Sequence, residues 1–236
     1  MPHNTALITG ASRGLGRALA RALAARGWRL ILDARGADAL EAVRAELAPQ
    51  THVVALPGDI RDAAHRTALV EAAATLGSLD VLVNNAGALG ESPLPALLDY
   101  PLDRLEALYR TNVFAPLALI QDARRVIKAG ATIINLTSDA AVEAYPGWGG
   151  YGGSKAALEQ ISRVLAAEVP EWRVYWVDPG DMRTQMHQDA FPGEDISDRP
   201  DPESSVPGLL RLLDAALPSG RYKARTLAQE ADHAHA

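Results

Sequence analysis

The chain has no cysteine, so disulfide bridges, thiolate nucleophiles and cysteine-based zinc or iron–sulfur sites are excluded. Lysine is scarce, with only Lys128, Lys155 and Lys223 among 23 basic residues. No apolar run reaches the roughly 18 residues that a membrane span needs, and we see no signal peptide. A formal net charge of −6 without a basic block disfavours nucleic acid and anionic membranes as partners. We therefore expect a cytoplasmic protein, and we assign no metal-binding residues.

Short β-type runs alternate with longer helical stretches, and turn residues separate them. This alternation predicts a parallel sheet covered by helices on both faces, and 236 residues suit one α/β domain over 1–236. The expected strands cover 5–9, 29–33, 52–56, 79–83, 132–137 and 173–177, and the expected helices cover 15–26, 37–47, 62–76, 102–128, 151–169 and 203–217.

Several segments depart from this regular pattern. Pro116 falls inside the expected helix over 102–128, which it should interrupt or kink. Residues 187–207 are rich in proline, serine and acidic residues without periodicity, so we expect a mobile substrate lid at about 182–207. Residues 219–223 are expected to turn into a last short strand. The chain from Gln229 onward is expected to fray.

A glycine-rich loop joins the first expected strand to the first helix, with the sequence Thr9-Gly10-Ala11-Ser12-Arg13-Gly14-Leu15-Gly16. Glycines allow a tight turn and a close backbone approach to a pyrophosphate, which binds the free N–H groups of a helix N-terminus. Glycine-rich turns of this kind also occur for purely steric reasons. The position of the loop in the first βαβ unit favours a nucleotide site.

The end of the second expected strand, Leu32-Asp33-Ala34-Arg35, bears on the choice of nucleotide. A carboxylate on the ribose 2′-hydroxyl is typical of NAD sites, whereas arginines bind the 2′-phosphate of NADP. Asp33 fits the first alternative, and Arg13 with Arg35 fits the second. The competing interpretation is that Arg13 and Arg35 are ordinary surface charges, because the chain is rich in arginine. Asp59 is a candidate acceptor for the adenine amino group or a turn cap.

Tyr151 and Lys155 are four positions apart, on one face of an expected helix. A phenol with a pKa of about 10 is a poor acid or base at neutral pH, and a nearby ammonium lowers that pKa. Ser138 ends the fifth expected strand, where it either shares a carbonyl substrate with Tyr151 or is only a turn residue. Asn112 needs a polar partner if it is buried in the long helix.

Together these motifs resemble the classical short-chain dehydrogenase/reductase family in order and spacing from about residue 5 to residue 184. The matching features are the glycine loop, Asn84-Asn85-Ala86-Gly87, the tetrad Asn112, Ser138, Tyr151 and Lys155, and Pro179-Gly180 followed by Thr184. The resemblance implies a single-domain Rossmann-type, doubly wound α/β fold. It also implies hydride transfer between a nicotinamide cofactor and a carbonyl or alcohol substrate.

The resemblance also implies a role for each member of the tetrad. Tyr151 is the general acid in reduction and the base in oxidation, and Lys155 binds the nicotinamide ribose and lowers the Tyr151 pKa. Ser138 positions the substrate oxygen, and Asn112 holds a water in a proton relay. The implied cofactor contacts are Gly10, Ser12, Arg13, Gly14, Leu15, Gly16, Ala34, Arg35, Asp59, Ile60, Asn85, Ala86, Gly87, Tyr151, Lys155, Pro179, Gly180, Met182 and Thr184.

The resemblance favours NADP(H) over NAD(H) as the cofactor. Counted from Gly27 without a gap, Ala34 stands where NAD-type members carry aspartate, and Arg35 and Arg13 match basic positions of NADP-type members. Asp33 falls one position early, so its side chain should point to the other face of the sheet. A homotetramer or homodimer is implied, although the absence of the Asp-Gly-Gly ending of many members leaves a monomer open.

Two other functions remain as alternatives. A catalytically idle nucleotide sensor or scaffold would share this fold, but a mere binder has no need for Ser138 and Tyr151. A sugar-nucleotide epimerase or dehydratase of the extended branch usually has another glycine spacing and a longer substrate domain. Substrate choice should lie in 140–150 and in the lid. The aromatic and methionine side chains of these two segments either form an apolar pocket or pack the lid onto the body of the domain: Tyr145, Trp148, Met182, Met186 and Phe191.

Overall fold

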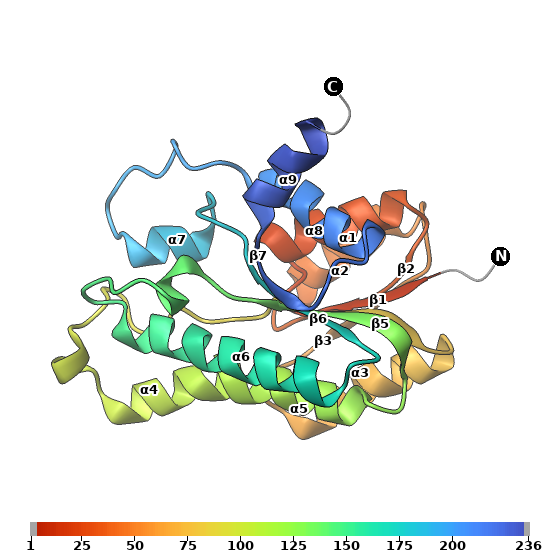
Figure 1. The fold of residues 1–236 in the computed structure, drawn as a ribbon, viewed down its shortest axis with the longest axis horizontal. Helices are drawn as coiled ribbons and strands as arrows, with labels where there is room; N and C mark the ends of the chain where they lie inside the picture. The colour runs from red at the N-terminus through yellow and green to blue at the C-terminus, as the bar shows by residue number, and fades with distance from the viewer. Residues whose placement is uncertain (1–3, 234–236) are drawn as a thin grey trace.

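The computed structural model describes residues 4–233, and within them seven parallel strands form one sheet (Figure 1). The sheet order is β3-β2-β1-β4-β5-β6-β7, so the chain winds outward from β1 in one direction and then from β4 in the other. This confirms the expected Rossmann-type, doubly wound sheet. The strands are β1 (Thr5–Ile8), β2 (Arg29–Ala34), β3 (Val53–Pro57), β4 (Leu79–Asn84), β5 (Ile127–Leu136), β6 (Arg173–Asp178) and β7 (Gly220–Lys223).

Helices cover both faces of the sheet (Figure 1). One face carries α1 (Gly14–Ala25), α2 (Ala37–Leu47), α8 (Val206–Asp214) and α9 (Ala224–His233), and the other carries α3 (Ala63–Thr75), α4 (Leu102–Tyr109), α5 (Ala115–Ala123) and α6 (Gly149–Glu168). Alternate strand residues serve the two cores, as in β2, where Leu32 packs towards α1 and α2 while Ile31 packs towards α3. Asp33 therefore shares the face of Ile31.

The short helix α7 (Gln185–Ala190) lies beside the carboxyl ends of the strands (Figure 1). Single 3₁₀ turns occur at Leu97–Asp99, Asp139–Ala141 and Pro202–Ser205. Within residues 4–233 no helix is both long enough and apolar enough to cross a membrane.

The expectation of one long helix over 102–128 is wrong at two places. After α4 the chain widens into a π-helical turn over Arg110–Phe114, and Ala115 N–H donates to the Arg110 carbonyl. Pro116 explains the widening, because proline has no N–H for the carbonyl four residues earlier and its ring would clash with that carbonyl. At the other end α5 stops at Ala123, and β5 begins at Ile127 because this segment pairs with Leu79 of β4.

The stretch over 187–207 is more ordered than its composition predicts. It includes most of α7, whose first turn is capped when His187 N–H donates to the Thr184 hydroxyl over 3.3 Å. The last major helix was expected over 203–217, but α8 starts at Val206 and ends at Asp214, before Ala216 adopts a φ of 47°. The mobility of the lid stays a prediction.

Three smaller expectations have clear outcomes. Asp62 caps α3 as predicted, since its carboxylate accepts from the Ala64 N–H at 3.0 Å. The short strand expected in 219–223 is β7. The fraying expected from Gln229 is wrong as far as His233, because this segment continues α9, which is anchored by buried Leu227. The remaining residues, 234–236, lie outside the described part of the chain.

Candidate active site

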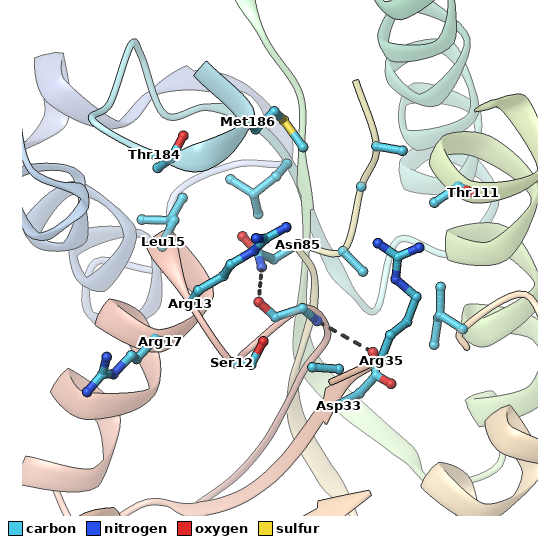
Figure 2. A pocket seen from close by; sticks show the side chains of 18 of the residues that line it. Ser12, Arg13, Leu15, Arg17, Asp33, Arg35, Asn85, Thr111, Thr184 and Met186 are labelled. Atoms are coloured by element: carbon cyan, nitrogen blue, oxygen red, sulfur yellow. Dashed lines mark hydrogen bonds between the residues drawn. The ribbon is translucent and has the colours of Figure 1, made fainter. Parts of the chain in front are cut away.

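A cleft of about 790 Å³ opens at the carboxyl ends of the central strands (Figure 2). Its walls come from the glycine loop after β1, the ends of β2 and β3, the loop after β4, and α6. A smaller pocket of about 100 Å³ adjoins it between α6 and α7. Tyr151 lines both spaces. Residues far apart in sequence thus meet at the crevice where sheets of this type bind ligands.

The glycine loop has glycine where the backbone requires it. Gly10 has a φ of 65°, and a Cβ there would lie 2.9 Å from the Ala86 Cα. At Gly16 a Cβ would lie 2.5 Å from Asn85 Nδ2, which donates to the Gly10 carbonyl at 3.0 Å. The loop is therefore fastened to the segment after β4. No side chain caps the N-terminus of α1, so its first N–H groups are available for a ligand.

Two arginines approach the cleft from opposite sides of the glycine loop (Figure 2). Arg13 and Arg35 are both exposed, and their guanidinium groups extend into the open space. Arg17 points away from the open space of the cleft and forms an ion pair with Glu46 at 2.8 Å. The arrangement concentrates positive charge beside the end of β2, which suits a phosphate group.

Asp33 is 2% exposed and is already engaged. Its Oδ1 lies 2.6 Å from His65 Nε2 on α3, and its Oδ2 accepts from the Gly10 N–H at 3.4 Å. The prediction that this side chain points to the other face of the sheet from Ala34 is confirmed. Asp59 also lines the cleft, where it pairs with Arg61 at 2.6 Å and accepts from the Arg61 N–H, as a turn cap does.

The catalytic candidates of α6 are buried at the inner end of the cleft. Tyr151 is 8% exposed and Lys155 is 5% exposed. The Lys155 ammonium lies 5.6 Å from the centroid of the Tyr151 ring and donates to the Leu136 carbonyl at 2.8 Å. The i and i+4 spacing therefore does place both groups together, as the sequence predicted.

Asn112 lies in the π-helical turn and ties three elements together. Its Nδ2 donates to the Ala88 carbonyl at 2.9 Å and to Ser154 Oγ at 3.0 Å, and its Oδ1 accepts from the Ala88 N–H at 2.8 Å. The polar partners that a buried asparagine needs are thus Ala88 and Ser154. π-Helical turns often occur at functional sites.

Ser138 faces the smaller pocket beside Tyr151. Its hydroxyl donates to Asp139 Oδ1 at 2.8 Å, and the other oxygen of Asp139 accepts from the Tyr145 hydroxyl at 3.1 Å. The rings of Trp148 and Tyr151 meet edge to face with their centroids 5.8 Å apart. Of the side chains expected to form an apolar pocket, Met182, Met186 and Trp148 line this space. Phe191 packs behind Trp148, while Tyr145 is 44% exposed.

The lowering of the Tyr151 pKa by Lys155 stays a prediction, because burial and other groups raise that pKa in this structure. Burial raises the pKa of Tyr151 above its usual range, Asp139 and Asp178 raise it further, and a hydrogen bond with Ser138 lowers it. Burial also lowers the pKa of Lys155 to about 8. Desolvation dominates because both groups are enclosed, and the ammonium bonds a backbone carbonyl rather than the phenol.

Most predicted cofactor contacts line the main cleft, but some do not. Gly16 is packed behind the loop, and Gly180 faces the smaller pocket with a φ of 77°. Asn112, which was predicted as a catalytic residue and not as a cofactor contact, lines neither space. Sequence reasoning missed His65 and Asp139, because no local spacing marks the partner of Asp33 or the neighbour of Ser138 as special. The predicted contacts on the cleft wall are Gly10, Ser12, Arg13, Gly14, Leu15, Ala34, Arg35, Asp59, Ile60, Asn85, Ala86, Gly87, Tyr151, Lys155, Pro179, Met182 and Thr184.

A model of the short chain dehydrogenase family matches residues 4–195, which include the glycine loop and all four tetrad residues. The chain belongs to the short-chain dehydrogenase family. This short-chain dehydrogenase is 37% identical over 188 residues to the serine 3-dehydrogenase of Agrobacterium fabrum, an alignment that covers 77% of this chain and 73% of the relative.

Solved structures agree with this assignment. An oxidoreductase from E. coli superimposes with a TM-score of 0.88 at 27% identity, covering 94% of this chain and 95% of its own. An alcohol dehydrogenase from Thermococcus sibiricus, complexed with 5-hydroxy-NADP, superimposes with a TM-score of 0.84 at 26% identity, again covering 94% and 95%. This short-chain dehydrogenase is therefore an oxidoreductase with a nucleotide-binding Rossmann-type fold.

Proposed function

We propose that this oxidoreductase is an NADP(H)-dependent carbonyl reductase and alcohol dehydrogenase in which Tyr151 exchanges the proton with the substrate oxygen. The observation that carries the proposal is the position of Tyr151. It lies on the wall shared by the main cleft and the smaller pocket, with Ser138 beside it and the Lys155 ammonium near its ring. A cofactor in the cleft and a substrate in the pocket would meet at this residue.

The residues of the cleft fit a nicotinamide dinucleotide. Gly10 and Gly14 leave room for a close backbone approach, and the uncapped N-terminus of α1 offers N–H groups to a pyrophosphate. Arg13 and Arg35 would hold a 2′-phosphate. The alcohol dehydrogenase from Thermococcus sibiricus, which is complexed with 5-hydroxy-NADP, shares this fold and supports the choice of NADP(H).

When bound, the nicotinamide supplies or accepts the hydride, and the side chains of this chain control the proton and the substrate. Tyr151 carries its proton at neutral pH, so its hydroxyl would donate that proton in carbonyl reduction. The raised pKa makes the phenol a weak acid, and the Lys155 ammonium, 5.6 Å from the ring centroid, would stabilise the phenolate as the proton leaves. Ser138 would orient the carbonyl oxygen beside it. Asn112 fixes the position of the Ala88 backbone, and Lys155 would bind the nicotinamide ribose.

The test is a panel of aldehydes, ketones and alcohols with NADPH, NADH and their oxidised forms. L-Serine belongs in the panel because of the similarity to a serine 3-dehydrogenase. The wild type should reduce at least one carbonyl with NADPH, and Tyr151→Phe should lose that activity while still binding NADP⁺. The matched control is Tyr222→Phe, which removes a hydroxyl bonded to the Pro218 carbonyl away from the cleft.

Tight NADP⁺ binding without turnover of any carbonyl or alcohol would instead favour a nucleotide sensor or scaffold. Two buried features argue against this alternative. The Tyr151–Lys155 pair and the Asn112 network keep polar groups desolvated at the inner end of the cleft, which lowers stability. A protein that only binds the nucleotide does not need these buried polar groups. Assembly into a homodimer or homotetramer stays a prediction.

A further inference from the structure

The carboxylate of Asp33 presents an apparent conflict at the adenosine end of the cleft. A carboxylate at the end of β2 is typical of sites that bind the ribose 2′-hydroxyl of NAD. Asp33 stands one position before the usual carboxylate and points to the other face of the sheet from Ala34, yet it still lines the cleft. Here Asp33 lines the same cleft as Arg13 and Arg35, which suit a 2′-phosphate. An unpaired anion between these arginines would repel the phosphate that they attract.

The partners of Asp33 resolve this conflict. Oδ1 is taken by His65 Nε2 at 2.6 Å, and Oδ2 is taken by the Gly10 N–H at 3.4 Å. The backbone carbonyl of Asp33 also accepts from the Ala11 N–H at 2.8 Å. Figure 2 shows the carboxylate turned to the backbone of the glycine loop rather than into the open space. Both carboxylate oxygens are thus occupied by protein donors.

The His65 ring is closely packed beside Asp33. Its side chain is 9% exposed, and it projects from the first turn of α3. A Cβ at position 58 would lie 2.3 Å from His65 Nδ1, so the ring fits only because residue 58 is glycine. Burial raises the pKa of Asp33, while the hydrogen bond and the charge of His65 oppose that rise. The histidine therefore supplies the shorter of the two hydrogen bonds to this buried carboxylate, and without it Oδ1 would lack a partner.

We propose that His65 is a specificity-determining residue which locks Asp33 away from the ribose, so that the arginines alone read the 2′ position and NADP(H) is preferred. The inference rests on the proposed function, since it explains how this chain rejects NAD(H) despite an aspartate at the end of β2. Removing the imidazole frees Oδ1. The carboxylate is then free to turn towards the cleft, where it repels a 2′-phosphate more strongly and accepts a hydrogen bond from a 2′-hydroxyl.

The experiment measures equilibrium binding of NADP⁺ and NAD⁺ by titration calorimetry, without any substrate or turnover. These two ligands differ only in the 2′-phosphate. His65→Leu removes the donor, His65→Gln keeps a side-chain N–H for Asp33, and His52→Leu is the matched control on an exposed histidine. We expect His65→Leu to lower the ratio of NADP⁺ to NAD⁺ affinity roughly tenfold, as loss of a charge-assisted interaction would. His65→Gln should retain most of the ratio.

A His65→Leu protein that binds both nucleotides more weakly by the same factor would overturn the proposal, because it would indicate only a loosened glycine loop. An unchanged ratio would overturn it as well. The double variant Asp33→Ala/His65→Leu should recover the wild-type ratio of NADP⁺ to NAD⁺ affinity, since the carboxylate that repels the 2′-phosphate is gone. Failure of that recovery would also contradict the lock.

Asp33→Asn tests the same idea without disturbing His65. The amide keeps the size of the side chain but removes its charge, so NAD⁺ affinity should stay within a factor of two of the wild type. A large loss of NAD⁺ affinity would show that Asp33 binds the ribose, and the lock would be refuted. The proposed function fails separately, through an NAD⁺ preference in the wild type or through absent turnover, because the lock is measured as a change in ratio between variants.

Discussion

The proposed functional side chains at the two ends of the cleft differ in burial and in hydrogen bonding. At the inner end, Tyr151 and Lys155 are buried, and Asn112 is tied to Ala88 and Ser154 by three hydrogen bonds. At the outer end, Arg13 and Arg35 are exposed and extend into open space. The inner end is organised before any ligand arrives, whereas the outer end offers exposed charges on the glycine loop and directly after β2.

This difference follows from the cost of burying polar groups. A buried amide or ammonium needs a protein partner, so each inner residue is bound to another and cannot be changed alone without a penalty. Exposed arginines are satisfied by water and can be exchanged without disturbing the fold. We therefore expect substitutions at the inner end to affect chemistry and stability together, and substitutions of the exposed arginines at the outer end to affect only nucleotide choice.

The largest effect is expected for Tyr151→Phe. Loss of a general acid typically costs about 10²–10⁴ in rate, so kcat for carbonyl reduction should fall by that order while the Kd for NADP⁺ stays nearly constant. Steady-state kinetics and calorimetric titration measure the two quantities. Retained activity would show that another group donates the proton.

Asn112→Ala should destabilise the protein and impair catalysis together. The change leaves the N–H and carbonyl of half-buried Ala88 without their partner, while Ser154 keeps its bond to the Tyr151 carbonyl at 2.7 Å. A buried unsatisfied group costs about 1–3 kcal/mol, so we expect a loss of that order. Chemical denaturation measures the free energy of unfolding. An unchanged midpoint would mean that water replaces the amide, and the inner end would then be less rigid than we infer.

Arg35→Ala should act on the outer end alone. Removing one cation from a 2′-phosphate site costs about 1.5–3 kcal/mol, so NADP⁺ should bind about tenfold to a hundredfold more weakly while NAD⁺ binding and thermal stability change little. Arg125→Ala, an exposed arginine outside the cleft, is the control. Equal weakening of both nucleotides would contradict a role for Arg35 in reading the 2′ position.

The smallest effect is expected for Asp139→Asn, which shifts a pH profile. Asp139 raises the Tyr151 pKa by charge, so its neutralisation should lower that pKa. Reduction requires the protonated phenol and is lost as pH rises through its pKa. The alkaline limb of kcat for reduction should therefore move to lower pH in the variant, measured against the wild type. A shift to higher pH would show that the lost Ser138 contact outweighs the charge.

The sequence by itself determined the features that depend on local spacing. Four features follow from the periods and ends of strands and helices: the glycine loop, the alternation of strands and helices, the i and i+4 placement of Tyr151 and Lys155, and the position of Asp33 on the opposite face of the sheet from Ala34. Each of these concerns residues within one element or at its end. Such relations are decided by backbone geometry, which short stretches of sequence specify.

Only the tertiary structure decided what those residues meet. The bonds of Asn112 to Ala88 and Ser154, the start of β5 at Ile127 and the lock of His65 on Asp33 depend on contacts between separate elements. The high Tyr151 pKa has the same origin, because burial is a property of the packed molecule rather than of the Tyr–Lys spacing. Packing sets the dielectric surroundings and the hydrogen-bond partners, and these determine the chemistry of each group.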